Sequence, residues 1–271
     1  MNWFQSIVYG LISGFTEFLP LSSYAHQQIF MHLCGQNARD PAMDLCVHIA
    51  LLLAVRSYCQ PVLDQFARDL RTYKKGAVRN TRSLLDQRLV KQAAIPMLIL
   101  FFILYYIFAG VSNILTASIG LLINGVLLFL PSRMLSGNKD SHSMSAVDSV
   151  MLGVAGSLSA VPGFSRLGCT VSFATMRGVD RKHALQWALL LSMHALGALV
   201  IIDLVKLFAG SGLSALRYIL NYILAGIGAY FCGYLGIKFI RFITIKQDYS
   251  IFAYYCWGAS LFAFILYLTV V

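Results

Sequence analysis

The sequence is poor in charged residues, and that shortage limits the kinds of protein it can form. Of its 271 residues, 12% are charged and 58% are hydrophobic, whereas an average soluble domain carries about 25% charged residues. A buried core cannot account for so large a deficit, so lipid must cover much of the surface. No polar linker separates the apolar stretches. The composition therefore excludes an ordinary soluble domain and predicts one membrane domain over residues 1–271.

Several common signatures are also missing. The six cysteines, at positions 34, 46, 59, 169, 232 and 256, show no paired spacing typical of disulfides or zinc sites, and we interpret them as small hydrophobic side chains. There is no Walker loop or dinucleotide fingerprint. The first residues lack a basic region and a cleavage site, so we expect the first helix to be retained.

Acidic residues are scarcer than basic ones, which gives a formal net charge of +10. Eight of the 21 Lys and Arg fall within residues 64–91, without the interleaved aromatic residues of a nucleic-acid surface. Such a cluster beside apolar stretches is typical of a cytoplasmic loop. We therefore expect a membrane protein with no nucleic-acid partner. The eight are Arg68, Arg71, Lys74, Lys75, Arg79, Arg82, Arg88 and Lys91.

Six apolar stretches are long enough to cross a bilayer as helices. Two more, 3–33 and 149–176, are interrupted midway by Pro, Gly, Ser and a charge. Broken segments of this kind form re-entrant helix–loop–helix hairpins that protein shields from lipid. The expected fold is an all-α integral membrane protein with about six transmembrane helices and two hairpins. The predicted spans are 43–62, 93–110, 112–131, 184–208, 217–240 and 251–271.

The distribution of basic residues supports this arrangement. The four segments expected on the cytoplasmic side hold 16 of the 21 basic residues, and the expected outer segments hold only Arg39. This requires each hairpin to return to the side from which it entered, and it places both termini outside. The cytoplasmic segments are 64–91, 132–148, 177–183 and 238–248, and the outer segments are 34–42 and 209–216.

The two hairpins resemble each other. Ser13-Gly14 precedes Pro20 by the spacing at which Ala155-Gly156 precedes Pro162, and a Ser-rich turn follows each proline. The first hairpin enters from outside and the second from the cytoplasm. Similar segments that enter from opposite faces form an inverted-topology repeat, and we expect their tips to meet near the bilayer midplane.

The first hairpin carries the only glutamate in the chain, Glu17. An ionisable group in an apolar segment is costly and indicates a functional site, unless hydrogen bonds hold it for structure alone. Ser22, Ser23 and His26 follow it closely. A carboxylate, hydroxyls and an imidazole at this spacing supply a metal ligand or base, a nucleophile and a proton carrier.

The second hairpin carries an isolated guanidinium, Arg166, deep in an apolar run. A buried arginine needs an anionic partner. Nearby glycines would let backbone amides approach a ligand, and hydroxyl donors would complete a phosphate cradle. An internal ion pair with Glu17 is the alternative, and a substrate-free site is compatible with both. The candidate ligands are Gly163, Ser165, Arg166, Gly168 and Thr170.

Other polar residues within the spans have plainer explanations. His48 and His194 lie on apolar helices, where a hydrogen-bonded core histidine is the commoner outcome. Asp203 and Lys206 lie near the outer end of a predicted span, and we expect their side chains to snorkel toward water.

The hairpin motifs resemble those of the undecaprenyl-diphosphatase family, also called the bacitracin-resistance type. Residues 13–26 read Ser-Gly-Phe-Thr-Glu-Phe-Leu-Pro-Leu-Ser-Ser-Tyr-Ala-His, similar to the family signature E-G-x-T-E-F-L-P-[IV]-S-S-T-G-H. Residues 162–170 are similar to P-G-x-S-R-S-G-x-T. Weaker matches extend the resemblance over nearly the whole chain.

The resemblance implies hydrolysis of undecaprenyl diphosphate to the monophosphate, which recycles the lipid carrier of cell-wall synthesis. It implies a site that opens to the outer face of the bacterial plasma membrane and depends on a divalent cation, Mg²⁺ or Ca²⁺; a homodimer is compatible with it. By position, Glu17 would be the metal ligand or acid/base, Ser22 and Ser23 the nucleophile or phosphate contacts, and His26 the proton-transfer partner. The diphosphate would be held by Ser165, Arg166 and Thr170.

Four departures from the family pattern matter, two of them at adjacent positions. Tyr24-Ala25 replaces Thr-Gly, and Leu167 replaces a serine. Ser13 stands where the family has a glutamate, and a neutral hydroxyl weakens a site for a hard divalent cation. Ser13 itself, Asp44 or a lipid phosphate oxygen would then complete the coordination.

Two other functions stay open. Inverted repeats with broken helices are transporter architecture, and Ser13 is compatible with a polyprenyl-phosphate flippase of weak or no phosphatase activity. A binding-only protein that sequesters an antibiotic or regulates another protein is the third reading. Release of phosphate by the purified protein distinguishes the first function from these two.

Overall fold

A computed structural model describes residues 1–270 except 37, 75–81, 136, 210–217 and 247–248. Most of the predicted outer segment 209–216 and the centre of the predicted basic loop therefore lie outside the described residues. The described residues form α-helices and one short 3-10 helix, with a single isolated bridge between Lys139 and Val179 and no strand.

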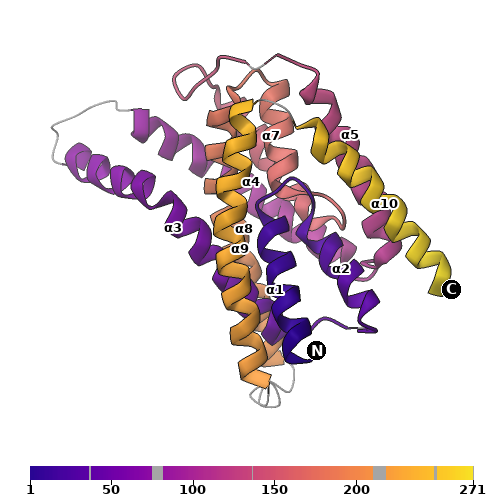
Figure 1. Cartoon of the computed structure of the whole chain (residues 1–271). Helices are drawn as coiled ribbons and strands as arrows, with labels where there is room; N and C mark the ends of the chain where they lie inside the picture. Colours follow the sequence, from indigo (N-terminus) through magenta and orange to yellow (C-terminus); the bar gives the residue numbers. More distant parts are fainter. Residues whose placement is uncertain (37, 75–81, 136, 210–217, 247–248, 271) are drawn as a thin grey trace.

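Six helices are long and apolar enough to cross a membrane, and the chain is an all-α integral membrane protein. Successive spanning helices alternate in direction, and both chain termini lie toward the end of the molecule remote from the tip of α3 and α4 (Figure 1). The six are α3 (Pro41–Lys74), α4 (Arg82–Ala109), α5 (Ile114–Ser132), α8 (Arg181–Ala209), α9 (Ile219–Lys246) and α10 (Ser250–Val270).

The basic segment 64–91 is helical at both ends, and its position on the cytoplasmic side stays a prediction. α3 continues well into the segment, and α4 begins within it. The two extensions support each other, because Gln87 Nε2 donates to the backbone carbonyl of Phe66 at 3.0 Å and the Ser83 hydroxyl donates to Asp69. The segment is also rich in Leu, Arg, Lys and Gln, which all favour helix.

The remaining helices form two pairs, and in each pair the second helix turns back toward the end where the first began (Figure 1). The pairs agree with the predicted hairpins in chain order and in the position of the turn. Their placement within a bilayer, and so their re-entrant character, stays a prediction. The pairs are α1 (Trp3–Glu17) with α2 (Ser23–Leu33), and α6 (Ala146–Ser157) with α7 (Arg166–Met176), the latter joined through η1 (Leu158–Ala160).

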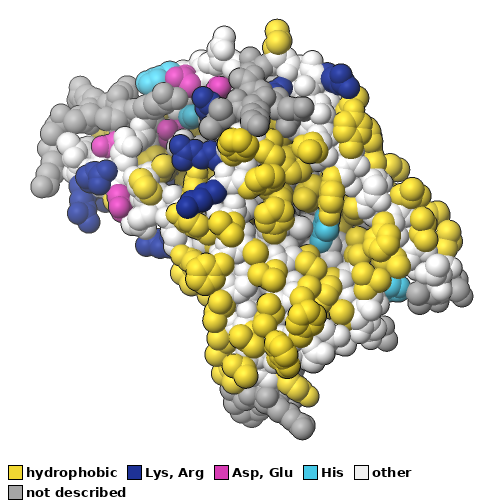
Figure 2. Space-filling model, viewed as in Figure 1, with side chains coloured by type: hydrophobic (Ala, Val, Ile, Leu, Met, Phe, Trp, Pro, Cys, Tyr) yellow, Lys and Arg dark blue, Asp and Glu magenta, His cyan; other side chains and the backbone are white. Residues whose placement is uncertain are grey.

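Apolar packing organises the bundle around α8, whose side chains are largely buried. α3, α7 and α4 pack against it, α9 packs along α1 and α3, α4 also packs on α6, and α10 lies along α5. The outer faces of α4 and α10 expose many large apolar side chains. Figure 2 shows hydrophobic side chains over the middle and lower parts of one face, with most of its Lys and Arg toward the top and left. This pattern fits a lipid-covered belt with one basic end.

Glycines on α1 permit close contact with α9. A Cβ atom at Gly10 would lie 2.1 Å from the carbonyl oxygen of Ala225, and one at Gly14 would lie 2.6 Å from that of Ala229. Both alanines are fully buried. Small residues four apart on facing helices let backbones approach, which is a common way to join helices in lipid, where burial from water contributes no attraction. This contact fixes the first hairpin on α9.

We expect Gly10→Ala to destabilise the protein by about 1–3 kcal/mol, because the added methyl group overlaps the α9 backbone. Thermal unfolding in detergent measures the effect. Gly197→Ala on α8 is the matched control, since a Cβ atom there meets nothing within 4 Å; alanine's better helix propensity should leave stability unchanged or higher. Equal unfolding temperatures for the two variants would contradict this packing.

Candidate active site

The tips of the two helix pairs contact each other. The backbone nitrogen of Ser165 donates to Asn124 Oδ1 at 3.0 Å, and Asn124 Nδ2 donates to the carbonyl oxygen of Pro20 at 3.0 Å. The Ser165 hydroxyl also donates to the carbonyl oxygen of Leu19 at 3.2 Å. Asn124, from α5, is fully buried. One amide side chain therefore joins the two tips, as the predicted meeting of the hairpins requires.

Glu17 and Arg166 form an ion pair across this contact. Glu17 is the last residue of α1, Arg166 is the first residue of α7, and their side chains are 11% and 5% exposed. Arg166 Nε also donates to the hydroxyl of Ser192 on α8 at 3.2 Å. The internal ion pair considered from the sequence is thus formed. A buried charge is tolerated only with such a partner, so a ligand that separates the two must supply new ones.

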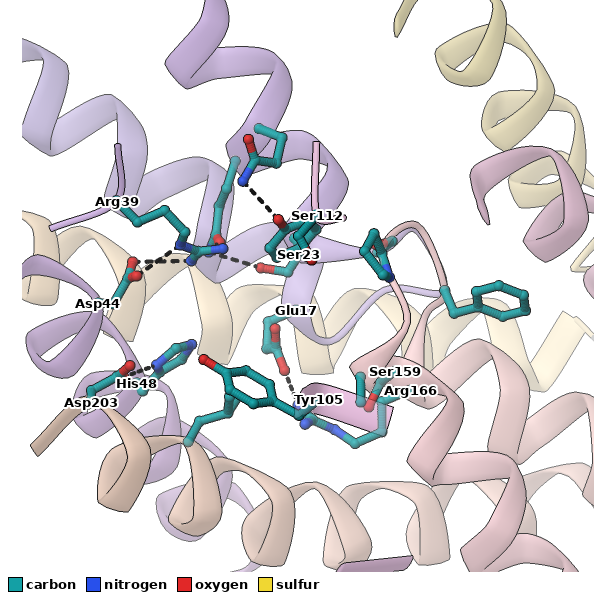
Figure 3. Close-up of a pocket in the computed structure, with 18 of the residues that line it drawn as sticks. Glu17, Ser23, Arg39, Asp44, His48, Tyr105, Ser112, Ser159, Arg166 and Asp203 are labelled. Carbon is teal, nitrogen blue, oxygen red and sulfur yellow. Dashed lines mark hydrogen bonds and ion pairs between the residues drawn. The ribbon is translucent and has the colours of Figure 1, made fainter. Parts of the chain in front are cut away.

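The ion pair lies in the wall of a cavity of about 340 Å³ (Figure 3). Apolar side chains from α4 and α8, including Phe101 and Leu199, form another part of the wall. The charged side chains comprise three carboxylates and three cations, so their formal charges cancel. They are Glu17, Asp44, Asp203, Arg39, Arg166 and Lys206.

Two helix N-termini border the same cavity. Ser22 is the N-cap of α2 and accepts from the backbone nitrogen of Ala25 at 3.4 Å; Ser165 is the N-cap of α7 and accepts from that of Gly168 at 3.2 Å. Ser22, Ser23 and Ser165 all line the cavity. The positive ends of helix dipoles and their free amides favour anions. The arrangement therefore suits a negatively charged ligand.

Ser22 has an unusual backbone conformation. It is the one non-glycine residue with a positive φ, 64°, in the part of the chain that the structure describes. Such a conformation costs about 1–3 kcal/mol and persists where the surroundings impose it, commonly at functional sites. Here it turns the chain from the end of α1 into α2 and keeps Ser22 and Ser23 at the cavity.

The two further metal ligands considered from the sequence already have hydrogen-bond partners within the protein, and of the two only Asp44 lines the cavity. Asp44 accepts from Arg39 Nε at 2.8 Å and from the Tyr9 hydroxyl at 2.6 Å. The Ser13 hydroxyl donates to the Tyr9 carbonyl at 2.6 Å, accepts from Gln27 Nε2 at 2.9 Å, and is absent from the cavity wall. No group of three or more His, Cys, Asp or Glu suited to a metal occurs among the described residues.

Arg39 is a cation of the wall that the motifs did not indicate. Its Nη2 donates to Gln27 Oε1 at 2.6 Å and to Asp44 Oδ1 at 3.0 Å. Burial acts to lower the pKa of Arg39, but the Asp44 carboxylate and the Tyr9 hydroxyl more than reverse this and hold the pKa well above its usual range. Arg39 therefore stays charged beside the cavity. A lone basic residue in the 34–42 segment was the only sequence signal for it.

Three predicted phosphate contacts lie outside the cavity wall. Gly163, with φ 89°, and Gly168 serve packing instead: a Cβ atom would lie 2.4 Å from the Ala117 carbonyl in the first case and 3.1 Å from Pro20 Cβ in the second. Thr170 is fully buried, and its hydroxyl has no hydrogen-bond partner among the described residues. The glycines thus bring the tip close to α5 and to the first hairpin rather than to a ligand.

His26 also lies outside the cavity wall. Its ring stacks on Tyr255 of α10, with Nε2 2.9 Å from the Tyr255 hydroxyl and Nδ1 2.9 Å from the carbonyl oxygen of Ser22. Both ring nitrogens are therefore engaged away from the cavity. The predicted proton-transfer role of His26 gains no support from this arrangement.

Two polar pairs in the wall link distant segments. His48 Nδ1 lies 2.6 Å from Asp203 Oδ2, and Lys206 Nζ donates to the Tyr105 hydroxyl at 2.5 Å. Asp203 is only 4% exposed, so the expectation that its side chain snorkels toward water is wrong. The carboxylate is hydrogen-bonded to His48 on α3 instead of to water. His48 is hydrogen-bonded, as expected, but it lines the cavity. A single sequence does not show which residues so far apart in the chain will pair. Its only indication here is that these ionisable groups lie in apolar helices.

Proteins of one family resemble the whole chain. The family described as Bacitracin resistance protein BacA matches residues 6–262. The undecaprenyl-diphosphatase of Halothermothrix orenii is 32% identical over 270 residues, which cover 98% of each chain. Undecaprenyl-diphosphatase 3 of Bacillus cereus is 28% identical over 273 residues, 99% of each chain. The undecaprenyl-diphosphatase of Methanobrevibacter smithii is 27% identical over 281 residues, 97% of each chain.

Asn124→Leu should loosen both tips together, because it leaves the buried Ser165 amide without a partner, at about 1–3 kcal/mol, and leaves the Pro20 carbonyl only the weak thiol donor of Cys256 at 3.7 Å. Hydrogen exchange in detergent should show faster exchange at residues 18–22 and 163–168. Ser118→Ala, on the same helix, removes a buried hydrogen bond to Ser260 and should leave both segments protected. Unchanged exchange at the tips in Asn124→Leu would show that the amide does not join them.

Proposed function

This chain belongs to the bacitracin resistance protein BacA family, and on that premise we propose that it hydrolyses undecaprenyl diphosphate to undecaprenyl phosphate and inorganic phosphate. The reaction returns the lipid carrier of cell-wall synthesis to its monophosphate form. The observation that carries the proposal is the buried pair of Glu17 and Arg166 in the wall of a charged cavity. Relatives named for this hydrolysis match nearly the full chain, and the flippase and binding-only readings have no comparable support.

Arg166 binds the diphosphate in this proposal. A guanidinium matches phosphate oxygens with two parallel hydrogen bonds, and a phosphate that replaces Glu17 keeps the buried cation paired. The N-termini of α2 and α7 add partial positive charge at the same wall, and the Ser165 side chain lies there with them. Substrate binding is therefore an exchange of anionic partners around one fixed cation.

A divalent cation fits the charge balance of the cavity. Because the ionised side chains of the wall cancel, a diphosphate enters as excess negative charge. Mg²⁺ commonly binds one or two carboxylates together with substrate phosphates, and Glu17, released from Arg166, is the carboxylate that we propose for it. When bound, Mg²⁺ or Ca²⁺ would stabilise negative charge on the phosphoryl oxygens. We do not assign the cation to Ser13, which lies outside the cavity wall, or to Asp44, which lines the wall but is paired with Arg39.

The attacking oxygen comes from Ser22, Ser23 or water. Both serines line the cavity at the turn that follows Glu17. In-line attack on the terminal phosphorus breaks its bond to the bridging oxygen, and the lipid monophosphate leaves. Attack by water gives inorganic phosphate directly, whereas attack by a serine leaves a phosphoserine, which water then hydrolyses to release the phosphate. Phosphoryl transfer of this kind needs mainly positioning and charge stabilisation, which the two helix termini and Arg166 supply.

The apolar part of the wall receives the first isoprene units, beside Phe101 and Leu199. The cavity lies near the ends of α4 and α8 that are remote from the basic segments, since Ala109 and Lys206 line it close to the last residues of these helices. Under the positive-inside rule, we propose that it opens to the outer face of the plasma membrane.

Arg166→Ala and Glu17→Gln should each lower phosphate release by about 10²–10³-fold, since the first removes the cation that binds the phosphoryl group and the second removes the carboxylate proposed for the divalent cation. The assay is release of phosphate from polyprenyl diphosphate by protein purified in detergent. Arg133→Ala is the control, because Arg133 lies over the Phe129 ring at 4.7 Å, outside the cavity wall. The double variant Arg166→Met/Glu17→Gln leaves no unpaired buried charge and separates lost catalysis from unfolding. Near-normal turnover in either single variant would refute the assignment.

Removal of divalent cations with a chelator should abolish phosphate release, and added Mg²⁺ or Ca²⁺ should restore it. Glu17→Asp should need more cation for half-maximal rate, because the shorter side chain places its oxygens differently. Asp44→Asn should keep the wild-type cation dependence, since Asp44 is paired with Arg39. Full activity in chelator would exclude a cation from the reaction.

A further inference from the structure

A buried histidine–carboxylate pair lies in the cavity wall, outside both motifs. His48 comes from α3 and Asp203 from α8. The Nδ1–Oδ2 distance is 2.6 Å, and the side chains are 10% and 6% exposed. Both residues line the cavity that holds Glu17 and Arg166. In Figure 3 the pair lies on one side of the cavity and Arg166 on the other.

The carboxylate determines the state of the imidazole. Asp203 accepts the hydrogen on Nδ1, which leaves Nε2 of the neutral ring with a free lone pair. No described residue hydrogen-bonds Nε2. The same carboxylate stabilises the imidazolium that forms when Nε2 takes up a proton. A carboxylate that orients a histidine in this way is the usual support of a general base.

A purely structural role explains the pair less well. α3 and α8 already share the main apolar core, and apolar side chains would join them without the cost of burying two ionisable groups. Their position in the cavity wall is what a reacting group requires. His26 lies outside this wall, and both of its ring nitrogens have partners, the Ser22 carbonyl and the Tyr255 hydroxyl.

We propose that His48 Nε2 accepts the proton of the attacking oxygen, with Asp203 as its positioning residue. As the oxygen bonds to the terminal phosphorus, its O–H bond breaks and the proton moves to Nε2. The bridging P–O bond breaks, and its electron pair leaves with the lipid monophosphate. The imidazolium then returns its proton to the solvent. This inference rests on the proposed hydrolysis and names the base of that reaction.

Each of the other charged groups around the cavity has a partner of its own. Arg39 binds Asp44, Arg166 binds Glu17, and Lys206 binds the Tyr105 hydroxyl. Asp203 forms an ion pair with the His48 ring, and Asp44, one turn earlier on the same helix, interacts with it electrostatically. Loss of His48 should therefore remove one ionisation from the pH–rate profile and leave the other pairs intact. The titratable and charged groups that line the cavity together with His48 are Asp44 on its own helix, Asp203 and Lys206 on α8, Tyr105 on α4, Glu17 on α1, Arg166 on α7, and Arg39.

pH–rate profiles of His48→Gln and Asp203→Asn test the proposal. The full chain, purified in detergent, is assayed with polyprenyl diphosphate and Mg²⁺ from about pH 5 to 9, the range in which histidine changes charge. His48→Gln should lower kcat by about 10²–10⁴-fold, leave KM within a few-fold, and lose the acidic limb. Asp203→Asn should lower kcat but keep that limb, since the base is present and only its orientation is lost.

His194→Gln is the matched control. His194 lies on the same helix as Asp203, outside the cavity wall, with Nδ1 3.0 Å from the Leu190 carbonyl oxygen. This variant should keep the wild-type kcat and profile. A non-hydrolysable prenyl diphosphate with a methylene bridge measures binding separately, and His48→Gln should bind it with wild-type affinity because Arg166 is intact.

The outcomes distinguish a wrong assignment of the base from a wrong assignment of the reaction. An active wild type with a near-normal kcat or a retained acidic limb in His48→Gln overturns this inference alone. So does a parallel loss of analogue binding and thermal stability, which marks a structural pair. Loss of the limb in His26→Gln would assign proton transfer to that residue. A wild type that releases no phosphate overturns the proposed function and this inference with it.

Discussion

The ion pair between Glu17 and Arg166 is the interaction on which the site depends. Neither charge could stay buried without the other, and the two residues come from helix pairs that approach from opposite ends of the bundle. Their meeting therefore requires that both tips be held in place. The same requirement gives the site its chemistry, because an arginine that is kept buried by one exchangeable carboxylate can accept a phosphate instead.

The surrounding structure holds these tips by backbone contacts. Asn124 bridges the two turns through their amide and carbonyl groups, and glycines let the turns approach their neighbours closely. Gly10 and Gly14 fix α1 on α9 in the same way. In a lipid environment close backbone packing and satisfied polar groups replace the attraction that burial from water gives soluble proteins. The strained backbone conformation of Ser22 persists only because this packing holds the residues around it in place.

Charge balance connects the cavity to the proposed reaction. Every ionised side chain in the wall has a partner in the described structure, so the site is stable without substrate. In the reaction that we propose, a diphosphate would disturb this balance and a divalent cation would restore it. Arg166 would bind the phosphoryl group and Glu17 the cation, while His48, held by Asp203, would accept a proton. Recognition and proton transfer would then be divided between the motifs of the hairpins and a pair of helices outside them.

The sequence by itself determined the fold class, the order of six spans and two broken segments, and the two charges at the centre of the site. Composition and isolated ionisable residues are local properties, and the lipid environment makes them informative. It did not show how far α3 and α4 extend into the basic segment 64–91, because the contact between Gln87 and Phe66 that supports both extensions is tertiary. Only the tertiary structure decided that Gly163, Gly168, Thr170 and His26 lie outside the cavity and that Arg39, His48 and Asp203 line it. Those positions depend on how helices distant in the chain pack together, which a single sequence does not encode in any local pattern.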